Sequence, residues 1–263
     1  MIPASVLRQR NHLLARIHQR YQTREQLLQI GPLSLQFTSI ADPDRVLDDA
    51  AAAEESAVAG SPAPSVPYWA ELWDSAMGLA QWLTERTSLA DVVICGTAAR
   101  AVAPDITAGG GCATTLHQGA LASVLDLGCG MGLSGVCAAA LGARVTFADL
   151  ETLPLLFARL NSLPWQHQVE ARQIDWRTDA LGQNFDLILG ADILYERSQW
   201  EYLDRFWDAH LSPGGLVALG EPGRQTGEEF AAWIVRRGWN LHETPQVAGP
   251  EKKAIRVLQL RRQ

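Results

Sequence analysis

The stretch Val124-Leu-Asp-Leu-Gly-Cys-Gly-Met-Gly-Leu-Ser-Gly135 decides how this chain folds. Its first residues form a short apolar run typical of a buried strand, and the alanine-rich residues after Gly135 favour a helix. Glycine has no Cβ, so the turn between them can bring its backbone close to a ligand. The N-terminus of the helix adds unpaired N–H groups and the positive end of a dipole. We therefore expect a strand over 123–128, a helix from Gly132, and a turn that binds a ligand rather than a tight turn that binds nothing.

Two patterns overlap in this turn. Gly130-x-Gly132-x-x-Gly135 matches the dinucleotide fingerprint, and Asp149 then stands where an acidic residue would hold a ribose, which predicts a nicotinamide-dependent oxidoreductase. The second pattern, Asp126-x-Gly128-x-Gly130-x-Gly132, begins inside the strand. The glycines alone do not decide between the two, so the cofactor has to be inferred from residues further along the chain.

Strands and helices alternate after the glycine stretch. This alternation predicts a mostly parallel sheet with helices on both faces. The last two strands have no helix between them and predict a closing antiparallel pair. The expected strands are 144–149, one ending at Asp175, 185–190, 216–221, 240–247 and 254–260, and the expected helices are 152–160, 198–210 and 227–237.

The residues before the glycine stretch are organised differently. Apolar residues at helical spacing predict one basic amphipathic helix over 4–29, and Gly31-Pro32 ends it. Its five arginines are the basis of a weak nucleic-acid hypothesis, but a solvated helix face is the better interpretation. We expect an N-terminal extension over 1–66 and a second domain over 67–263. The elements expected in this part are a strand over 33–38, a helix over 44–52, a linker over 53–66, a helix over 74–85 and a mobile insertion over 96–120.

Composition limits the kinds of partner. The chain has 263 residues and a net charge of −7, so a globally basic nucleic-acid-binding protein is disfavoured. No apolar run is long enough to span a bilayer, and the first residues lack the apolar core of a secretory signal. The cysteines show no CxxC spacing or clustered histidines, so we expect no metal, no disulfide framework and a cytoplasmic location; they are Cys95, Cys112, Cys129 and Cys137.

Three further segments contain acidic or aromatic residues of the kinds found in binding sites, two of them at predicted strand ends. Asp175-Trp176 closes the third strand, and Gly190-Ala-Asp192-Ile-Leu-Tyr195 closes the fourth. Pro67-Tyr-Trp-Ala-Glu-Leu-Trp-Asp74 precedes a helix. Together with the glycine stretch, these segments resemble the class I, seven-strand S-adenosylmethionine-dependent methyltransferases. Within that class they are similar to the chaperone-type protein-lysine methyltransferases and to bacterial relatives that act on nicotinamide and other small amines. The resemblance covers about 67–260, interrupted by 96–120.

This resemblance implies a fold, a cofactor and a set of site residues. The fold would be a doubly wound, seven-stranded, mostly parallel Rossmann-like sheet with an antiparallel C-terminal strand, here preceded by a helical N-terminal extension. The cofactor would be S-adenosyl-L-methionine, with Trp73 near its methionine end, Asp149 on the ribose and Trp176 against the adenine. Asp192 and Tyr195 would stand where the methyl acceptor enters. The remaining residues implied to hold the cofactor are Asp126, Gly128, Cys129, Gly130, Gly132, Asp175 and Ala191.

The acceptor stays open between a protein lysine and a small amine. A lysine must lose its proton before it can attack, and a carboxylate such as Asp192 raises an amine's pKa, so Asp192 fits orientation better than deprotonation. Glu221-Pro-Gly-Arg224 resembles the small-amine relatives more closely; Arg224 is either an anion-binding residue or a surface arginine. Trp69 is equally suited to the core and to a pocket wall. Tyr68 and Glu71 favour structural roles. A non-catalytic module with this fold is a further alternative, and oligomeric state is not predicted.

Overall fold

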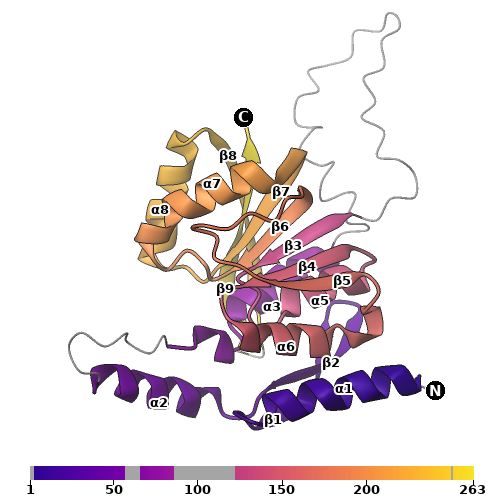
Figure 1. Ribbon diagram of the computed structural model, residues 1–263. Coiled ribbons are helices and arrows are strands. Elements are labelled where there is room, and N and C mark those ends of the chain that lie inside the picture. The colour runs from indigo at the N-terminus through magenta and orange to yellow at the C-terminus, as the bar shows by residue number, and fades with distance from the viewer. Residues whose placement is uncertain (1–2, 57–65, 86–121, 250) are drawn as a thin grey trace, which may run out of the picture.

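The computed structural model describes residues 3–56, 66–85, 122–249 and 251–263. The expected insertion over 96–120 and most of the expected linker over 53–66 therefore lie outside the described residues. Within these ranges, a seven-stranded sheet and a separate two-stranded hairpin form the framework of the protein (Figure 1).

The seven-stranded sheet has the order β5-β4-β3-β6-β7-β9-β8. Neighbours among β3 to β7 pair in parallel, whereas β9 runs antiparallel to both β7 and β8. This arrangement confirms the expected fold class, including the antiparallel strand near the C-terminus. The strands are β3 (Ser123–Leu127), β4 (Arg144–Asp149), β5 (Val169–Gln173), β6 (Phe185–Ala191), β7 (Leu211–Glu221), β8 (Trp239–Ala248) and β9 (Lys253–Arg262).

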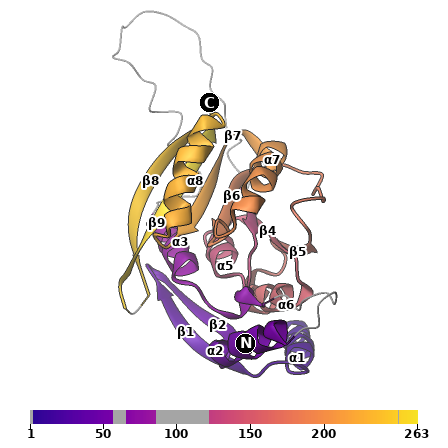
Figure 2. The same ribbon diagram turned by 90° about the vertical axis from the view of Figure 1, so that its left-hand side faces the viewer.

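Helices cover both faces of this sheet. Successive residues of a strand point to opposite faces, so Val124 packs into the core beneath one helical layer and Leu125 into the core beneath the other. Figure 2 shows α7 and α8 on the far side of the strands from α6. The first layer contains α3 (Asp74–Thr84), α5 (Leu133–Ala140) and α6 (Thr152–Asn161), and the second contains α7 (Trp200–His210) and α8 (Gln225–Arg236).

Most expected boundaries in this part agree with the structure to within two or three residues. The strand expected to end at Asp175 ends earlier, at Gln173, and β7 begins at Leu211 rather than at 216. Leu211 pairs with Phe185, but the register shifts before the next pair, Leu187 with Leu216. The intervening residues 212–215 read Ser-Pro-Gly-Gly, so their sequence predicts a turn rather than a strand. Short 3-10 turns occur at η1 (Tyr68–Ala70), η3 (Leu163–Trp165) and η4 (Arg197–Gln199).

The N-terminal segment differs most from the expectation. The helix predicted over 4–29 is wrong beyond Ile17: α1 (Ala4–Ile17) ends there, and β1 (Thr23–Ile30) pairs antiparallel with β2 (Leu33–Ile40). A turn at Gly31, with φ of 52°, joins the two strands. Residues 23–30 form a strand because they pair with β2, and the spacing of apolar residues within one segment does not reveal such pairing. The expected strand over 33–38 and the expected helix over 44–52 are confirmed, the latter as α2 (Pro43–Glu55).

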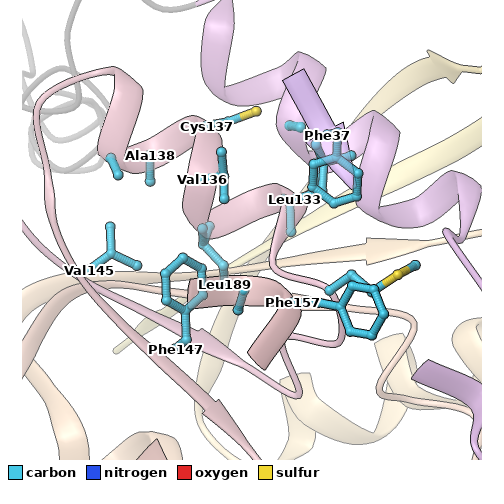
Figure 3. Close-up of a cluster of buried hydrophobic side chains, with 14 of the residues drawn as sticks. Phe37, Leu133, Val136, Cys137, Ala138, Val145, Phe147, Phe157 and Leu189 are labelled. Carbon is cyan, nitrogen blue, oxygen red and sulfur yellow. The ribbon is translucent and has the colours of Figure 1, made fainter. Parts of the chain in front are cut away.

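The hairpin shares a core with the first helical layer. Phe37 of β2 is fully buried beside Leu133 of α5 and Phe157 of α6 (Figure 3). The Asn161 side chain closes two hydrogen bonds with the Thr38 backbone, accepting from its N–H at 2.8 Å and donating to its carbonyl at 3.1 Å. The N-terminal segment is therefore packed against α6 and fixes the helix that follows β4.

Candidate active site at the carboxyl edge of the sheet

A cavity of about 600 Å³ lies over the carboxyl ends of β3, β4 and β6. That volume falls within the range of small-molecule sites, roughly 300–1,000 Å³. The cavity gathers every predicted site residue except Asp126. Those lining it are Trp73, Gly128, Cys129, Gly130, Gly132, Asp149, Asp175, Trp176, Ala191, Asp192 and Tyr195.

The turn after β3 requires glycine for two reasons. Gly128 and Gly132 have φ of 63° and 88°, in the left-handed region that other residues rarely adopt. A Cβ at Gly128 would come within 2.9 Å of Ile193 Cγ2, and one at Gly132 within 2.8 Å of Ala158 Cβ. Side chains at these two positions would therefore clash with neighbouring groups, and glycine lets the turn backbone line the cavity.

Asp126 supports this turn from below the cavity wall. Its carboxylate is buried and accepts a hydrogen bond of 2.8 Å from the Gly135 N–H at the start of α5. Burial raises the pKa of Asp126 to about 7, an effect that this hydrogen bond only partly offsets. The residue is therefore placed to hold the strand–helix turn rather than to touch a ligand.

Asp149 ends β4 and lies against the same turn. One carboxylate oxygen accepts from the Gly130 N–H at 3.0 Å and the other from the Glu151 N–H at 3.1 Å. The residue is only 9% exposed, and burial raises its pKa to about 6. Each oxygen keeps a second lone-pair position, so this carboxylate can still accept hydroxyl donors from a ligand in the cavity.

Trp176 and Asp175 follow β5 on the adjoining wall. The Trp176 indole N–H donates to Gln199 Oε1 at 3.1 Å, and its ring lies beside Gly128. The partly buried ring offers an apolar face to a planar ligand. The carboxylate of Asp175 is bound by the Arg177 guanidinium, with a shortest contact of 2.6 Å, which lowers the pKa of Asp175.

Aromatic residues from the segment before α3 and from the segment after β6 also line the cavity. The rings of Tyr68 and Tyr195 lie 5.9 Å apart, and both are about half exposed at the mouth of the cavity. Burial raises the pKa of Tyr195. Trp69 lines the cavity and also packs edge-on against Tyr21, so it belongs both to the wall and to the core. Tyr68 and Glu71 also line the cavity, so the purely structural interpretation of these two residues misses their position.

Sequence reasoning also missed the partner of Asp192. Arg224, from the loop after β7, donates to both oxygens of the Asp192 carboxylate at 2.6 and 3.2 Å. The two residues follow the neighbouring parallel strands β6 and β7, and the shared edge of such strands is the signal that could have paired them. Asp192 therefore lines the cavity as one half of an ion pair.

The described ranges contain neither a metal-binding cluster nor a membrane-spanning helix. No set of three or more His, Cys, Asp or Glu side chains there is arranged to hold a metal ion. None of the helices among the described residues is both long and apolar enough to cross a bilayer.

Curated proteins that resemble this chain match it over part of its length. A protein N-lysine methyltransferase, METTL21A of Xenopus tropicalis, is 41% identical over 104 residues, covering 37% of this chain and 47% of the relative. Phosphoethanolamine N-methyltransferase 1 of Zea mays is 32% identical over 126 residues, covering 46% of this chain and 25% of the relative. The chain thus matches about half or less of the length of these curated relatives.

One solved structure and one family model also match this chain. The N-methyltransferase NodS from Bradyrhizobium japonicum, in complex with S-adenosyl-L-homocysteine, superposes with a TM-score of 0.47 at 18% identity, covering 55% of this chain and 80% of that one. The model of the lysine methyltransferase family matches residues 68–225, which include the aromatic wall, the glycine turn and the strand ends described above. On this match, the chain belongs to the lysine methyltransferase family.

Proposed function

We propose that this protein is an S-adenosylmethionine-dependent N-methyltransferase whose acceptor is an amine, foremost a protein lysine. The observation that carries the proposal is the family match over 68–225, because that span contains all the residues that line the cavity apart from Glu54 and Val66. The match favours this cofactor over the dinucleotide that the glycine spacing also allows, and it disfavours a non-catalytic module.

The residues present fit this cofactor. Asp149 offers lone-pair positions to the two ribose hydroxyls, and the Trp176 ring offers a face to the adenine. Bare backbone at Gly128 and Gly130 can approach the amino-acid end, which Trp73 would cover. Cys129, Gly132, Asp175 and Ala191 complete this proposed binding set, while Asp126 acts through the turn.

When bound, the cofactor supplies a methyl group on a positively charged sulfur, ready for in-line displacement. The chain's own contribution is to orient the acceptor and to exclude water from the site. Tyr195 and Tyr68 would flank the acceptor at the mouth, and Asp192 would orient it through hydrogen bonds. The acceptor nitrogen must be uncharged when it attacks, since a protonated amine has no lone pair.

The relatives support two acceptor classes. Similarity to METTL21A, a protein N-lysine methyltransferase, favours a protein lysine. Similarity to phosphoethanolamine N-methyltransferases favours a small amine as the second candidate. We further propose a cytoplasmic enzyme that binds neither nucleic acid nor membrane, with 1–66 as an extension and 67–263 as the methyltransferase domain. The net charge of −7 and the free thiols of Cys129 and Cys137 support this assignment.

Cofactor and acceptor can be tested separately. Calorimetry with S-adenosylhomocysteine and with NADH should give binding only to the former. Incubation with methyl-labelled S-adenosylmethionine and a cell lysate should then place label in protein, and hydrolysis should return methylated lysine. Label in small molecules alone would support the small-amine candidate, and binding of NADH instead of S-adenosylhomocysteine would overturn the proposal.

A further inference from the structure

Arg224 is held firmly in place by a chain of charged groups. The buried carboxylate of Glu221, the last residue of β7, accepts from the backbone N–H groups of Gly223 at 2.9 Å and Arg224 at 2.7 Å. The same carboxylate is ion-paired at 2.6 Å with Arg256 of β9. A loop fixed at its backbone in this way presents the Arg224 side chain in one direction, toward the end of β6.

Asp192 is fixed equally well on the other side. Its backbone is left-handed, with φ of 55°, and its N–H donates to the Gly220 carbonyl at 2.9 Å. Its side chain is only 8% exposed, whereas that of Arg224 is 45% exposed. The Arg224 guanidinium also lies 6.0 Å from the centre of the Trp73 ring, so Arg224 stands behind two residues that line the cavity, Asp192 and Trp73.

This pairing sets Asp192 apart from other acidic residues of the cavity. Glu71, Glu151 and Glu196 also line it, and none of them has an arginine or lysine within ion-pair distance among the described residues. Asp175 pairs with Arg177, two residues along the chain. The carboxylate at the acceptor mouth is thus the one matched by an arginine from a different, rigidly held loop.

A lone carboxylate at this position would work against methyl transfer. It would attract the acceptor as an ammonium ion and raise the pKa of that amine, which removes the lone pair needed for attack. It would also favour a cationic ligand of the cavity over a neutral ligand of the same shape. A guanidinium bound to both oxygens cancels most of that attraction.

We propose that Arg224 is a specificity-determining residue, which neutralises Asp192 so that the mouth does not select cations and the acceptor amine enters uncharged. The inference rests on the proposed function, because it assumes a cationic methyl donor and an amine acceptor in this cavity. It assigns to Arg224 a role in the site rather than on an inert surface.

The test uses two ligands that differ by one methyl group and one positive charge. S-adenosylmethionine is a cation at sulfur, and S-adenosylhomocysteine is not. We would measure the affinity of the full-length protein for each by calorimetry and compare their ratio among variants. In Arg224→Met, the ratio should shift toward S-adenosylmethionine by roughly threefold to tenfold, the scale of one partly screened charge interaction.

Three further variants separate charge from shape. Arg224→Lys keeps the charge and should leave the ratio near that of the wild type. Asp192→Asn leaves Arg224 unpaired and should shift the ratio toward S-adenosylhomocysteine. The double variant Asp192→Asn/Arg224→Met has neither charge and should return the ratio toward the wild-type value. A purely structural role would change both affinities together and leave the ratio constant.

An unchanged ratio in Arg224→Met that retains the wild-type melting temperature would overturn the inference. A shift in the double variant equal to that in Arg224→Met would also overturn it, since the effect would then not pass through Asp192. If the wild-type protein bound neither ligand, the proposed function itself would fail, and this inference with it.

Discussion

Two carboxylates at neighbouring strand ends of one cavity are held in opposite ways. Asp149, at the end of β4, is bound by the backbone N–H groups of Gly130 and Glu151, and none of the ion pairs among the described residues involves it. Asp192, just past β6, is bound by the Arg224 side chain. Burial without a counter-charge raises the pKa of Asp149 to about 6. Asp149 can therefore still accept hydrogen bonds from hydroxyl groups of a ligand, whereas both oxygens of Asp192 already bind Arg224.

This difference indicates different roles for the part of the cavity around Asp149 and the part around Asp192. A group held by backbone donors stays in place when a ligand arrives, because those donors belong to the turn itself. The charge of Asp192 is instead balanced by the side chain of Arg224, so the net charge at this position is set by two residues. We therefore expect substitutions at Asp149 to act on cofactor affinity and substitutions at Asp192 to act on the acceptor.

The largest effect should come from Asp192. Asp192→Asn removes the orienting carboxylate and leaves the Arg224 charge unpaired beside the acceptor, so methyl transfer to the substrate identified by labelling should fall roughly tenfold to a thousandfold. Tyr195→Phe removes one hydroxyl, so the loss in methyl-transfer rate should be near the lower end of that range. Asp208→Asn is a matched control, because it breaks the 2.6 Å pair with Arg262 outside the cavity. Wild-type rates in both mouth variants would place the acceptor elsewhere.

Asp149→Ala should have the next largest effect, this time on the cofactor. Losing hydrogen bonds to a charged acceptor should weaken S-adenosylhomocysteine binding by about 2–3 kcal/mol, measured by calorimetry. Asp186→Ala serves as the control, since Asp186 also accepts from a backbone N–H of the sheet, that of Ser123, but lies outside the cavity lining. Equal affinities of the two variants would contradict a ribose contact at Asp149.

Trp176→Ala tests the apolar wall of the cofactor half. A ring stacked on adenine contributes about 1–3 kcal/mol to affinity, so binding should weaken by that amount. If Trp176 instead served mainly the core, the variant would lose about 3–5 kcal/mol of folding stability without ligand. Denaturant unfolding of the ligand-free variant distinguishes these outcomes. Trp233→Ala, on α8 and away from the cavity, should leave affinity unchanged.

The same contrast explains what could be read from the sequence. Asp149 accepts from the backbone N–H groups of Gly130, in the glycine turn, and of Glu151, two residues further on. Its position therefore follows from the glycine pattern and from the order of the strands. The partner of Asp192 is a side chain 32 residues away, and no spacing rule predicts which way an arginine on a loop will point. The strand β1 was missed for a related reason: its identity depends on pairing with β2 rather than on its own periodicity.

The aromatic wall was only partly predicted. Trp73 was expected at the cavity through resemblance, and it lies there. Tyr68 and Glu71 were interpreted as structural because their own spacing carries no chemical signal; the 3-10 turn at η1 is what brings them to the cavity. Local turns of this kind depend on packing against the rest of the fold, which residue types alone do not encode.

The smallest expected effect is a pH dependence of cofactor affinity that should belong to Asp149 alone. Ribose hydroxyls donate to the ionised carboxylate, so binding selects that form. In the free protein the pKa of Asp149 is raised to about 6, hence affinity for S-adenosylhomocysteine should be constant above pH 7 and fall below pH 6, by roughly tenfold between pH 7 and pH 5. Asp126, whose pKa is raised to about 7 mainly by burial and in part by the Asp149 charge, lies outside the cavity lining and does not reach the ribose position. Calorimetry across this range should therefore give a flat profile for Asp149→Asn, which cannot titrate, and a wild-type slope for Asp126→Asn. The reverse result would assign the titration to the turn and would remove Asp149 as the ribose acceptor.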